Sequence, residues 1–104
     1  MKLTLKHAVA AVILLLNLAV TVTAGQFEDA GAAFSRRDYA TALRLFRPLA
    51  EQRDARAQSM LGLLYDGGLG VSQDFTEAAK WYFKAAHQGQ IVAQFMLGKM
   101  YYGG

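Results

Sequence analysis

The chain repeats itself with a period of 36 residues, and this internal repeat limits the fold more than any other feature. Shifted by one period, residues 57–68 align with residues 93–104, and 8 of the 12 positions are identical. The same shift relates residues 38–52 to residues 74–88 at six identical or similar positions. Tandem repeats of this length are typical of solenoids, in which each unit packs only against its neighbours. The sequence therefore predicts a short tandem array.

Each unit is predicted to be a pair of helices. Asp74 followed by Glu77 fits a capping box at a helix start, in which the side chain of each residue accepts a hydrogen bond from the backbone N–H of the other. Gly89 fits a left-handed helix stop. Between them, apolar residues at helical spacing form one face that is predicted to point to the core: Phe75, Ala78, Ala79, Tyr82 and Ala86. Residues 57–65 show a second apolar stripe and form the preceding helix.

Two glycines lie inside predicted helices. Gly62 recurs one period later as Gly98, although a glycine within a helix costs about 1 kcal/mol relative to alanine. We therefore expect a neighbouring helix to pass both glycines too closely for a side chain. Gly67, Gly68 and Gly70 are predicted to end the helix and form the turn between the two helices of the unit, with Val71 filling the apolar junction.

One complete unit closely resembles the Sel1-like repeat, a relative of the tetratricopeptide repeat. The residues that carry the resemblance are Ala57, Leu61, Gly62, Tyr65, Gly68, Gly70, Val71, Asp74, Ala78, Trp81, Ala85, Ala86 and Gly89. The resemblance extends to the first helix of a following unit and, loosely, to a preceding unit. It implies the α-solenoid fold of that family and its usual role as a protein-binding scaffold.

The predicted fold is all-α: a short α-solenoid of antiparallel helix pairs, a tetratricopeptide-like superhelix, preceded by a signal-peptide helix. The array occupies residues 25–104, divided into a degenerate first unit (about 25–56), a full unit (57–92) and an incomplete unit (93–104). The first unit lacks the glycine-rich turn. Pro48 is predicted to kink its second helix, and Arg53 takes the place of Gly89, so its turn must differ or carry strain.

Residues 1–24 have the layout of a secretory signal peptide. Lys2 and Lys6 precede an uncharged stretch that ends in the small-residue sequence 22–24, so cleavage is predicted after Ala24. This predicts a secreted, periplasmic protein. An uncleaved membrane anchor is the alternative, in which case the membrane is contacted only through this leader. A buried core helix is a third interpretation, which the basic start and small-residue end argue against.

Charge argues against nucleic acid as a partner. The chain has 11 basic and 8 acidic residues, and removal of Lys2 and Lys6 leaves the array with a net charge of only +1. In the first unit arginines alternate with acidic residues. Arg47 and Glu51, four residues apart, are predicted to pair on a solvated helix face, although a docking patch for an acidic partner is the alternative.

The sequence offers no recognisable catalytic, cofactor or metal site, and we predict a protein that is not an enzyme. Cysteine is absent, and His87 is the only histidine outside the leader. Gly67 to Gly70 lacks the strand and the lysine of a phosphate-binding loop. The alternative is a minor repeat-bearing enzyme whose carboxylates, Asp66 and Asp74, perform acid–base work.

Positions that differ between units are free to recognise a partner. Ser59 becomes Phe95, Leu63 becomes Lys99 and Asp66 becomes Tyr102 one period later, so these six residues are the candidate partner-binding residues on a concave face. Ordinary surface is the alternative. The apolar residues 95–102 have no second helix to cover them. This predicts either self-association through that end or membership of a longer array.

The predicted function is therefore that of an exported, non-enzymatic scaffold that binds a protein or peptide and acts as an adaptor in a bacterial envelope complex. A membrane-tethered scaffold is the alternative, together with the enzyme above. The partner's identity is not encoded in any motif of this sequence.

Overall fold

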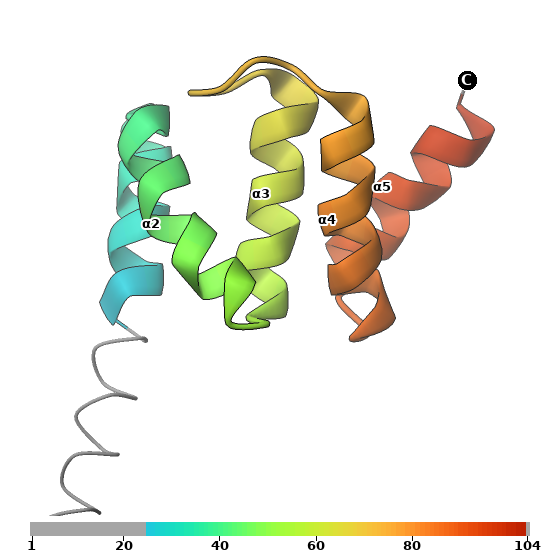
Figure 1. Cartoon of the computed structure of the whole chain (residues 1–104), viewed down its shortest axis with the longest axis horizontal. Coiled ribbons are helices and arrows are strands. Elements are labelled where there is room, and N and C mark those ends of the chain that lie inside the picture. The colour runs from blue at the N-terminus through green and yellow to red at the C-terminus, as the bar shows by residue number, and fades with distance from the viewer. Residues whose placement is uncertain (1–24, 104) are drawn as a thin grey trace, which may run out of the picture.

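The computed structural model of the protein describes residues 25–103, which form five helices and no strand (Figure 1). A first helix spans residues 25–35. It is followed by α2 (Tyr39–Glu51), α3 (Ala55–Gly67), α4 (Phe75–His87) and α5 (Ile91–Tyr102). The predicted all-α solenoid is confirmed. The predicted signal peptide and its cleavage site lie outside the described residues.

Four helices end in the same way, with one residue in the left-handed conformation. These residues are Arg37 (φ 63°), Arg53 (φ 70°), Gly68 (φ 64°) and Gly89 (φ 88°). After each of them, a backbone N–H donates to the carbonyl five residues earlier, as Asp54 does to Leu49 at 3.0 Å and Gln90 does to Ala85 at 3.1 Å. Arg53 thus repeats the turn of Gly89 with a strained backbone, which is the second of the two alternatives left open by the sequence.

Aspartates begin three of the helices. The Asp54 carboxylate accepts from the N–H groups of Arg56 and Ala57, and the Asp74 carboxylate accepts from the Glu77 N–H at 3.0 Å. The predicted capping box at Asp74 is only half formed. The Asp74 N–H donates to the Tyr65 carbonyl at 2.9 Å, which leaves Glu77 to pair with Lys80 at 3.7 Å.

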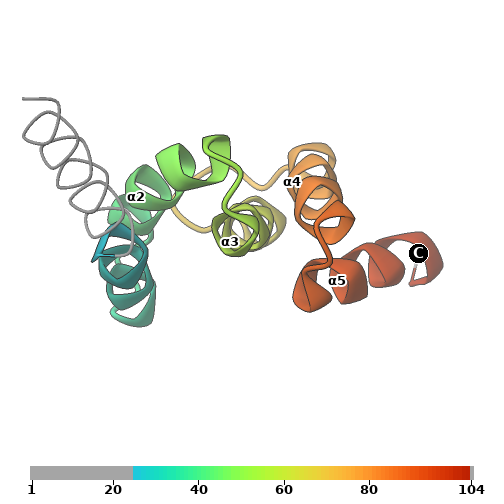
Figure 2. The same ribbon diagram turned by 90° about the horizontal axis from the view of Figure 1, so that it is seen from below.

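The helix α2 runs through Pro48 and ends at Glu51. Its ribbon changes direction part-way along (Figures 1 and 2), as expected where a proline removes the hydrogen bond to the Arg44 carbonyl. The predicted Arg47–Glu51 pair is absent from the ion pairs of residues 25–103. Arg47 instead donates to the Tyr65 hydroxyl at 2.6 Å, because Tyr65 of α3 lies within its reach.

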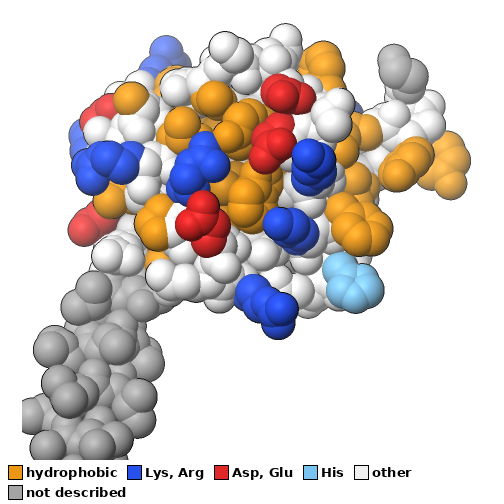
Figure 3. Space-filling view, in the orientation of Figure 1, with side chains coloured by type: hydrophobic (Ala, Val, Ile, Leu, Met, Phe, Trp, Pro, Cys, Tyr) orange, Lys and Arg blue, Asp and Glu red, His pale blue; other side chains and the backbone are white. Residues whose placement is uncertain are grey.

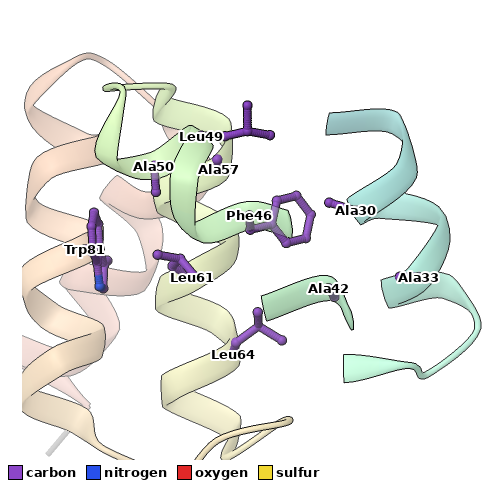
Figure 4. Close-up of a cluster of buried hydrophobic side chains, with 10 residues drawn as sticks. All are labelled: Ala30, Ala33, Ala42, Phe46, Leu49, Ala50, Ala57, Leu61, Leu64 and Trp81. Atoms are coloured by element: carbon purple, nitrogen blue, oxygen red, sulfur yellow. The ribbon is translucent and has the colours of Figure 1, made fainter. Parts of the chain in front are cut away.

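The core has two clusters. The larger one joins the first helix, α2 and α3, and Trp81 of α4 closes it (Figure 4). Phe46, Leu61 and Leu64 are fully buried there. The smaller cluster joins α4 to α5 through Tyr82 and Ala93, with Met96 and Met100 packed on it. Trp81, Met96 and Met100 thus serve packing between helix pairs.

The turn between α3 and α4 packs back on α2. A Cβ at Gly70 would lie 2.7 Å from the carbonyl of Tyr39, so only glycine fits there. Leu69, and not Val71, packs against the larger cluster. The expectation for Val71 was wrong because the left-handed Gly68 and Gly70 turn the backbone so that Leu69 meets the core.

The two repeat-related glycines, Gly62 and Gly98, behave differently. A Cβ at Gly62 would overlap the Tyr82 ring of α4, which confirms the predicted close approach. Gly98 has no atom within 4 Å of an added Cβ, so the same prediction is wrong there. The counterpart of Tyr82 one period later would be residue 118, which this sequence does not contain.

Candidate functional site

A groove of about 960 Å³ runs between α4 and α5, and we call it the α4–α5 groove. Its apolar lining is formed by Phe75, Ala79 and Phe83 of α4 and by Met96, Leu97, Met100 and Tyr101 of α5. Its polar lining is formed by Asp66, Thr76, Lys80, Lys84 and Lys99. A cleft of this size, mostly apolar with a few charged groups, has the composition of a binding site.

The groove forms because α5 is inclined to α4 (Figures 1 and 2). Ala93, near the start of α5, is fully buried against α4, whereas Tyr101 near its end is 80% exposed. Phe75 and Phe83 are 58% and 62% exposed on the groove side of α4. In Figure 3 apolar side chains are visible over the α4 and α5 side of the molecule with basic side chains beside them. Exposed aromatic surface of this extent is typical of an interaction site.

The polar lining of the groove is predominantly basic. Lys84 lies over the Trp81 ring at 4.5 Å and Lys99 lies 6.0 Å from the Phe95 ring centre. Within residues 25–103, Lys80 alone of these three lysines forms an ion pair, with Glu77 at 3.7 Å. The Asp66 carboxylate accepts from the Tyr82 hydroxyl at 3.1 Å. Burial, together with the charge and hydrogen bond of Asp66, raises the pKa of the Tyr82 phenol, so that hydroxyl stays protonated and donates.

The structure brings only two of the six predicted partner-binding residues into this groove, namely Asp66 and Lys99. Phe95 (66% exposed) and Tyr102 (93% exposed) are accessible but lie outside its lining. Leu63 is half-buried against the cluster between α4 and α5. Ser59 is 3% exposed, so it cannot meet a partner in this structure. It was mispredicted because a residue that differs between units can still lie inside the core.

Sequence reasoning missed the contribution of α4. It placed Phe75 and Ala79 on the core face, yet the buried side of α4 consists of Ala78, Trp81, Tyr82 and Ala85. Phe75, Ala79 and Phe83 form a second apolar stripe with a spacing of four residues, which faces the groove. That spacing is visible in the sequence and could have indicated a second apolar face.

The carboxylates considered for acid–base chemistry have structural hydrogen bonds. Asp74 begins α4, and Asp66 holds the Tyr82 hydroxyl. Among residues 25–103, no group of three or more His, Asp and Glu side chains is arranged to hold a metal ion. No helix of that same range has the length and apolar character needed to cross a membrane.

A comparison of the sequence with models of known protein families establishes the family of this chain. The family model of the Sel1 repeat matches three consecutive segments, residues 24–54, 55–90 and 91–104. The chain belongs to the Sel1 repeat family. Each match begins at or near the start of the first helix of a pair, namely the helix of residues 25–35, α3 and α5. No curated protein matches the chain.

Sel1 repeats are helical repeats that typically mediate protein–protein interaction, and the family is generally a non-catalytic scaffold. The signature residues of the repeat have structural roles in this chain. Ala57, Leu61, Ala78 and Ala85 are fully buried, while Gly68, Gly70 and Gly89 adopt positive φ. The signature therefore forms the packing of the solenoid, and the residues that line the groove lie largely outside it.

Proposed function

We propose that this Sel1 repeat protein is an exported, non-enzymatic scaffold that holds a segment of a partner protein in the α4–α5 groove. The observation that carries the proposal is the groove itself, an apolar floor that is exposed to solvent and bordered by three lysines. Exposed aromatic side chains supply the contact area that a bound polypeptide needs, and lysines at the border set its orientation.

The groove favours an acidic, partly apolar segment. Phe75, Phe83 and Met100 offer contacts for apolar side chains, while Lys84 and Lys99 attract carboxylates. Protein is a better partner than nucleic acid, because residues 25–104 carry nine basic and eight acidic residues. They therefore lack the excess of positive charge that binding to phosphate groups requires. The structural use of Asp66 and Asp74 supports a scaffold over an enzyme.

Export rests on the leader sequence. We propose that residues 1–24 direct the chain to the periplasm, where it acts as an adaptor in an envelope complex. The protein recovered from the periplasm should begin at Gly25. Recovery from the membrane with Met1 or the leader still attached would favour the tethered alternative.

Site-specific crosslinking tests the groove directly. A photoreactive residue at position 83 should give adducts with one envelope protein, which mass spectrometry identifies. The matched control is the same residue at position 28, which is exposed on the first helix and away from the groove. The identified partner, once purified, should bind the charge-reversal variant Lys99→Glu more weakly. Equal adducts at positions 28 and 83, or unchanged affinity of Lys99→Glu, would refute the proposal.

A further inference from the structure

A second hollow, of about 600 Å³, lies between α2 and α4, and we call it the α2–α4 hollow. Its lining includes three buried residues: Ala50, Gln58 and Trp81. It also includes three exposed polar residues: Arg53, Lys84 and Gln88. Every residue that lines it belongs to α2, α3, α4 or the turns that end α2 and α4. The hollow is therefore complete without any contribution from α5.

This hollow lies on a different side of the array from the residues predicted to bind a partner. Those six residues lie on α3 and α5, whereas α2 and α4 form the opposite side of the array (Figure 2). Figure 3 shows the α2 and α4 side, with apolar side chains near its centre and basic side chains on both flanks. Comparison of one repeat unit with the next did not indicate this surface.

A chain of side-chain amides holds one polar group at the border of the hollow. The buried Gln58 amide nitrogen donates to the Ala50 carbonyl at 3.1 Å, and the Gln58 oxygen accepts from the Gln88 amide nitrogen at 2.9 Å. Gln88 is itself exposed. Its side-chain oxygen accepts none of the hydrogen bonds found within residues 25–103. The fixed Gln88 amide can therefore accept a hydrogen bond from the backbone N–H of a bound peptide.

The charges of the hollow favour an anionic ligand. Lys84 lies over the Trp81 ring at 4.5 Å, and Arg53 stands at the end of α2. Neither of these basic residues forms an ion pair within residues 25–103. Glu51 is the one acidic residue of the lining. A carboxylate brought to Arg53 or Lys84 gains a charge-assisted hydrogen bond, and none of this chain's own carboxylates has to be displaced.

We propose that the α2–α4 hollow binds an acidic linear segment of a partner protein, in which an apolar side chain lies between carboxylates. The apolar side chain packs against Trp81 and Ala50, and the carboxylates pair with Arg53 and Lys84. A backbone N–H of the segment donates to the Gln88 oxygen. A hollow of this size holds a short stretch of polypeptide. The site is additional to the α4–α5 groove and does not rest on the function proposed for that groove.

Trp81 is the only tryptophan of the chain, so its fluorescence reports directly on this site. The probe is a capped peptide in which one leucine lies between two pairs of glutamates, added to the full chain as isolated after expression. We expect a saturable change in Trp81 fluorescence that weakens as salt is added. The same peptide with glutamines in place of the glutamates should bind about tenfold more weakly or worse. Lack of a saturable change with the acidic peptide overturns the inference.

Two glycine variants locate the peptide. Arg53→Gly should weaken binding about tenfold, because it removes one of the two cations. The matched control is Arg37→Gly, which removes the same charge from the same type of left-handed turn (φ 63°) but lies outside the lining of the hollow. Both changes relieve backbone strain, so weaker binding by Arg53→Gly does not reflect a less stable fold. Equal binding by the two variants would contradict the proposed site.

Removal of the one acidic group should have the opposite effect. Glu51→Gln should tighten binding of the acidic peptide about threefold, because a like charge no longer faces the carboxylates. A loss of affinity in Glu51→Gln would show that the carboxylates bind elsewhere.

Two further outcomes separate this inference from the proposed function. Lys99 lines the α4–α5 groove and not the α2–α4 hollow, so Lys99→Glu should leave peptide binding unchanged. If Lys99→Glu abolishes binding and Arg53→Gly does not, the peptide occupies the groove, and this inference fails while the proposed function stands. If free citrate displaces the peptide at an equal concentration, the hollow recognises a small carboxylate anion, and the inference of a peptide segment is wrong.

Discussion

Tyr82 lies directly over Gly62, so that the aromatic ring of α4 occupies the space that any side chain at residue 62 would need. The Tyr82 hydroxyl continues past the glycine to the Asp66 carboxylate, 3.1 Å away. The Tyr82 side chain therefore holds α4 against α3 by two contacts, one of its ring with Gly62 and one of its hydroxyl with Asp66. It also explains why a glycine is retained inside a helix, where it lowers helix stability.

Alanine at the two repeat-related glycines should have opposite effects. Gly62→Ala should lower the free energy of unfolding by about 1–2 kcal/mol, because overpacking against Tyr82 outweighs the gain in helix propensity. Gly98→Ala should raise it by about 1 kcal/mol, because its Cβ meets open space. Urea unfolding followed by circular dichroism measures both, with Gly31→Ala as the propensity control. A Gly62→Ala protein as stable as Gly98→Ala would contradict the packing described.

Relief of backbone strain at the end of α2 should stabilise the protein. Arg53 holds φ 70°, a conformation that costs residues other than glycine about 1 kcal/mol. We expect Arg53→Gly to raise the thermal unfolding midpoint, because relief of the strain adds about 1 kcal/mol to the free energy of unfolding. Part of this gain is lost because glycine increases the conformational entropy of the unfolded chain. Gly89→Ala is the converse change at the equivalent turn and should destabilise. A lower midpoint for Arg53→Gly would show that its side chain contributes more than the strain costs.

Removal of the cap of α4 should affect folding and not a chemical step. Asp74→Ala deletes the acceptor of the Glu77 N–H and should lower the free energy of unfolding by about 1 kcal/mol. Asp74→Asn retains an acceptor and should lose less. Chemical denaturation of the three proteins gives the comparison. An Asp74→Ala protein that is as stable as the unaltered chain would reopen a functional role for this carboxylate.

Acid should weaken the start of α3. Burial acts to raise the pKa of Asp54, but hydrogen bonds from Arg56 and from the Ala57 N–H outweigh it and hold the pKa below its ordinary value of 3.8. Because the folded pKa is the lower one, ionised Asp54 contributes stability that is present above that ordinary value and is lost as the pH falls through the folded pKa. The exposed Asp38 acts in the same direction through its hydrogen bond from Thr41.

The measurement for this acid effect is the urea midpoint between about pH 6 and about pH 2.5, across the window in which these carboxylates titrate. Asp54→Asn keeps a capping side chain and removes the titration, so its midpoint should fall less steeply with acid than that of the unaltered chain. Identical slopes for the two proteins would mean that Asp54 does not contribute to the acid sensitivity.

The 36-residue repeat was enough to predict the helix pairs, and the cap at Asp74 and the left-handed stop at Gly89 were enough to place the two ends of one helix. These features depend on residues close together in the chain. A capping carboxylate reaches a backbone N–H two or three residues away, and a left-handed residue closes a hydrogen bond over five residues. Local chemistry of this kind is readable without knowledge of the fold.

The residues of the α4–α5 groove were harder to predict from the sequence, because the groove depends on how the repeat units pack against each other. Ser59 and Lys99 both occupy positions that vary between units, yet one is buried and the other lines the groove. Gly62 and Gly98 share a repeat position, yet only one has a neighbouring ring. Sequence identity across a repeat does not by itself specify which side chain contacts a given position.

The sequence by itself therefore determined the helices, their ends and the family, since these follow from short-range hydrogen bonding and from an apolar period along one helix. Only the tertiary structure decided that Phe75 and Phe83 face a groove and that Lys99 lines this groove while Ser59 is buried. The inclination of α5 to α4 opens this groove. That inclination is set by the combined packing of side chains from separate helices, which no single stretch of sequence contains.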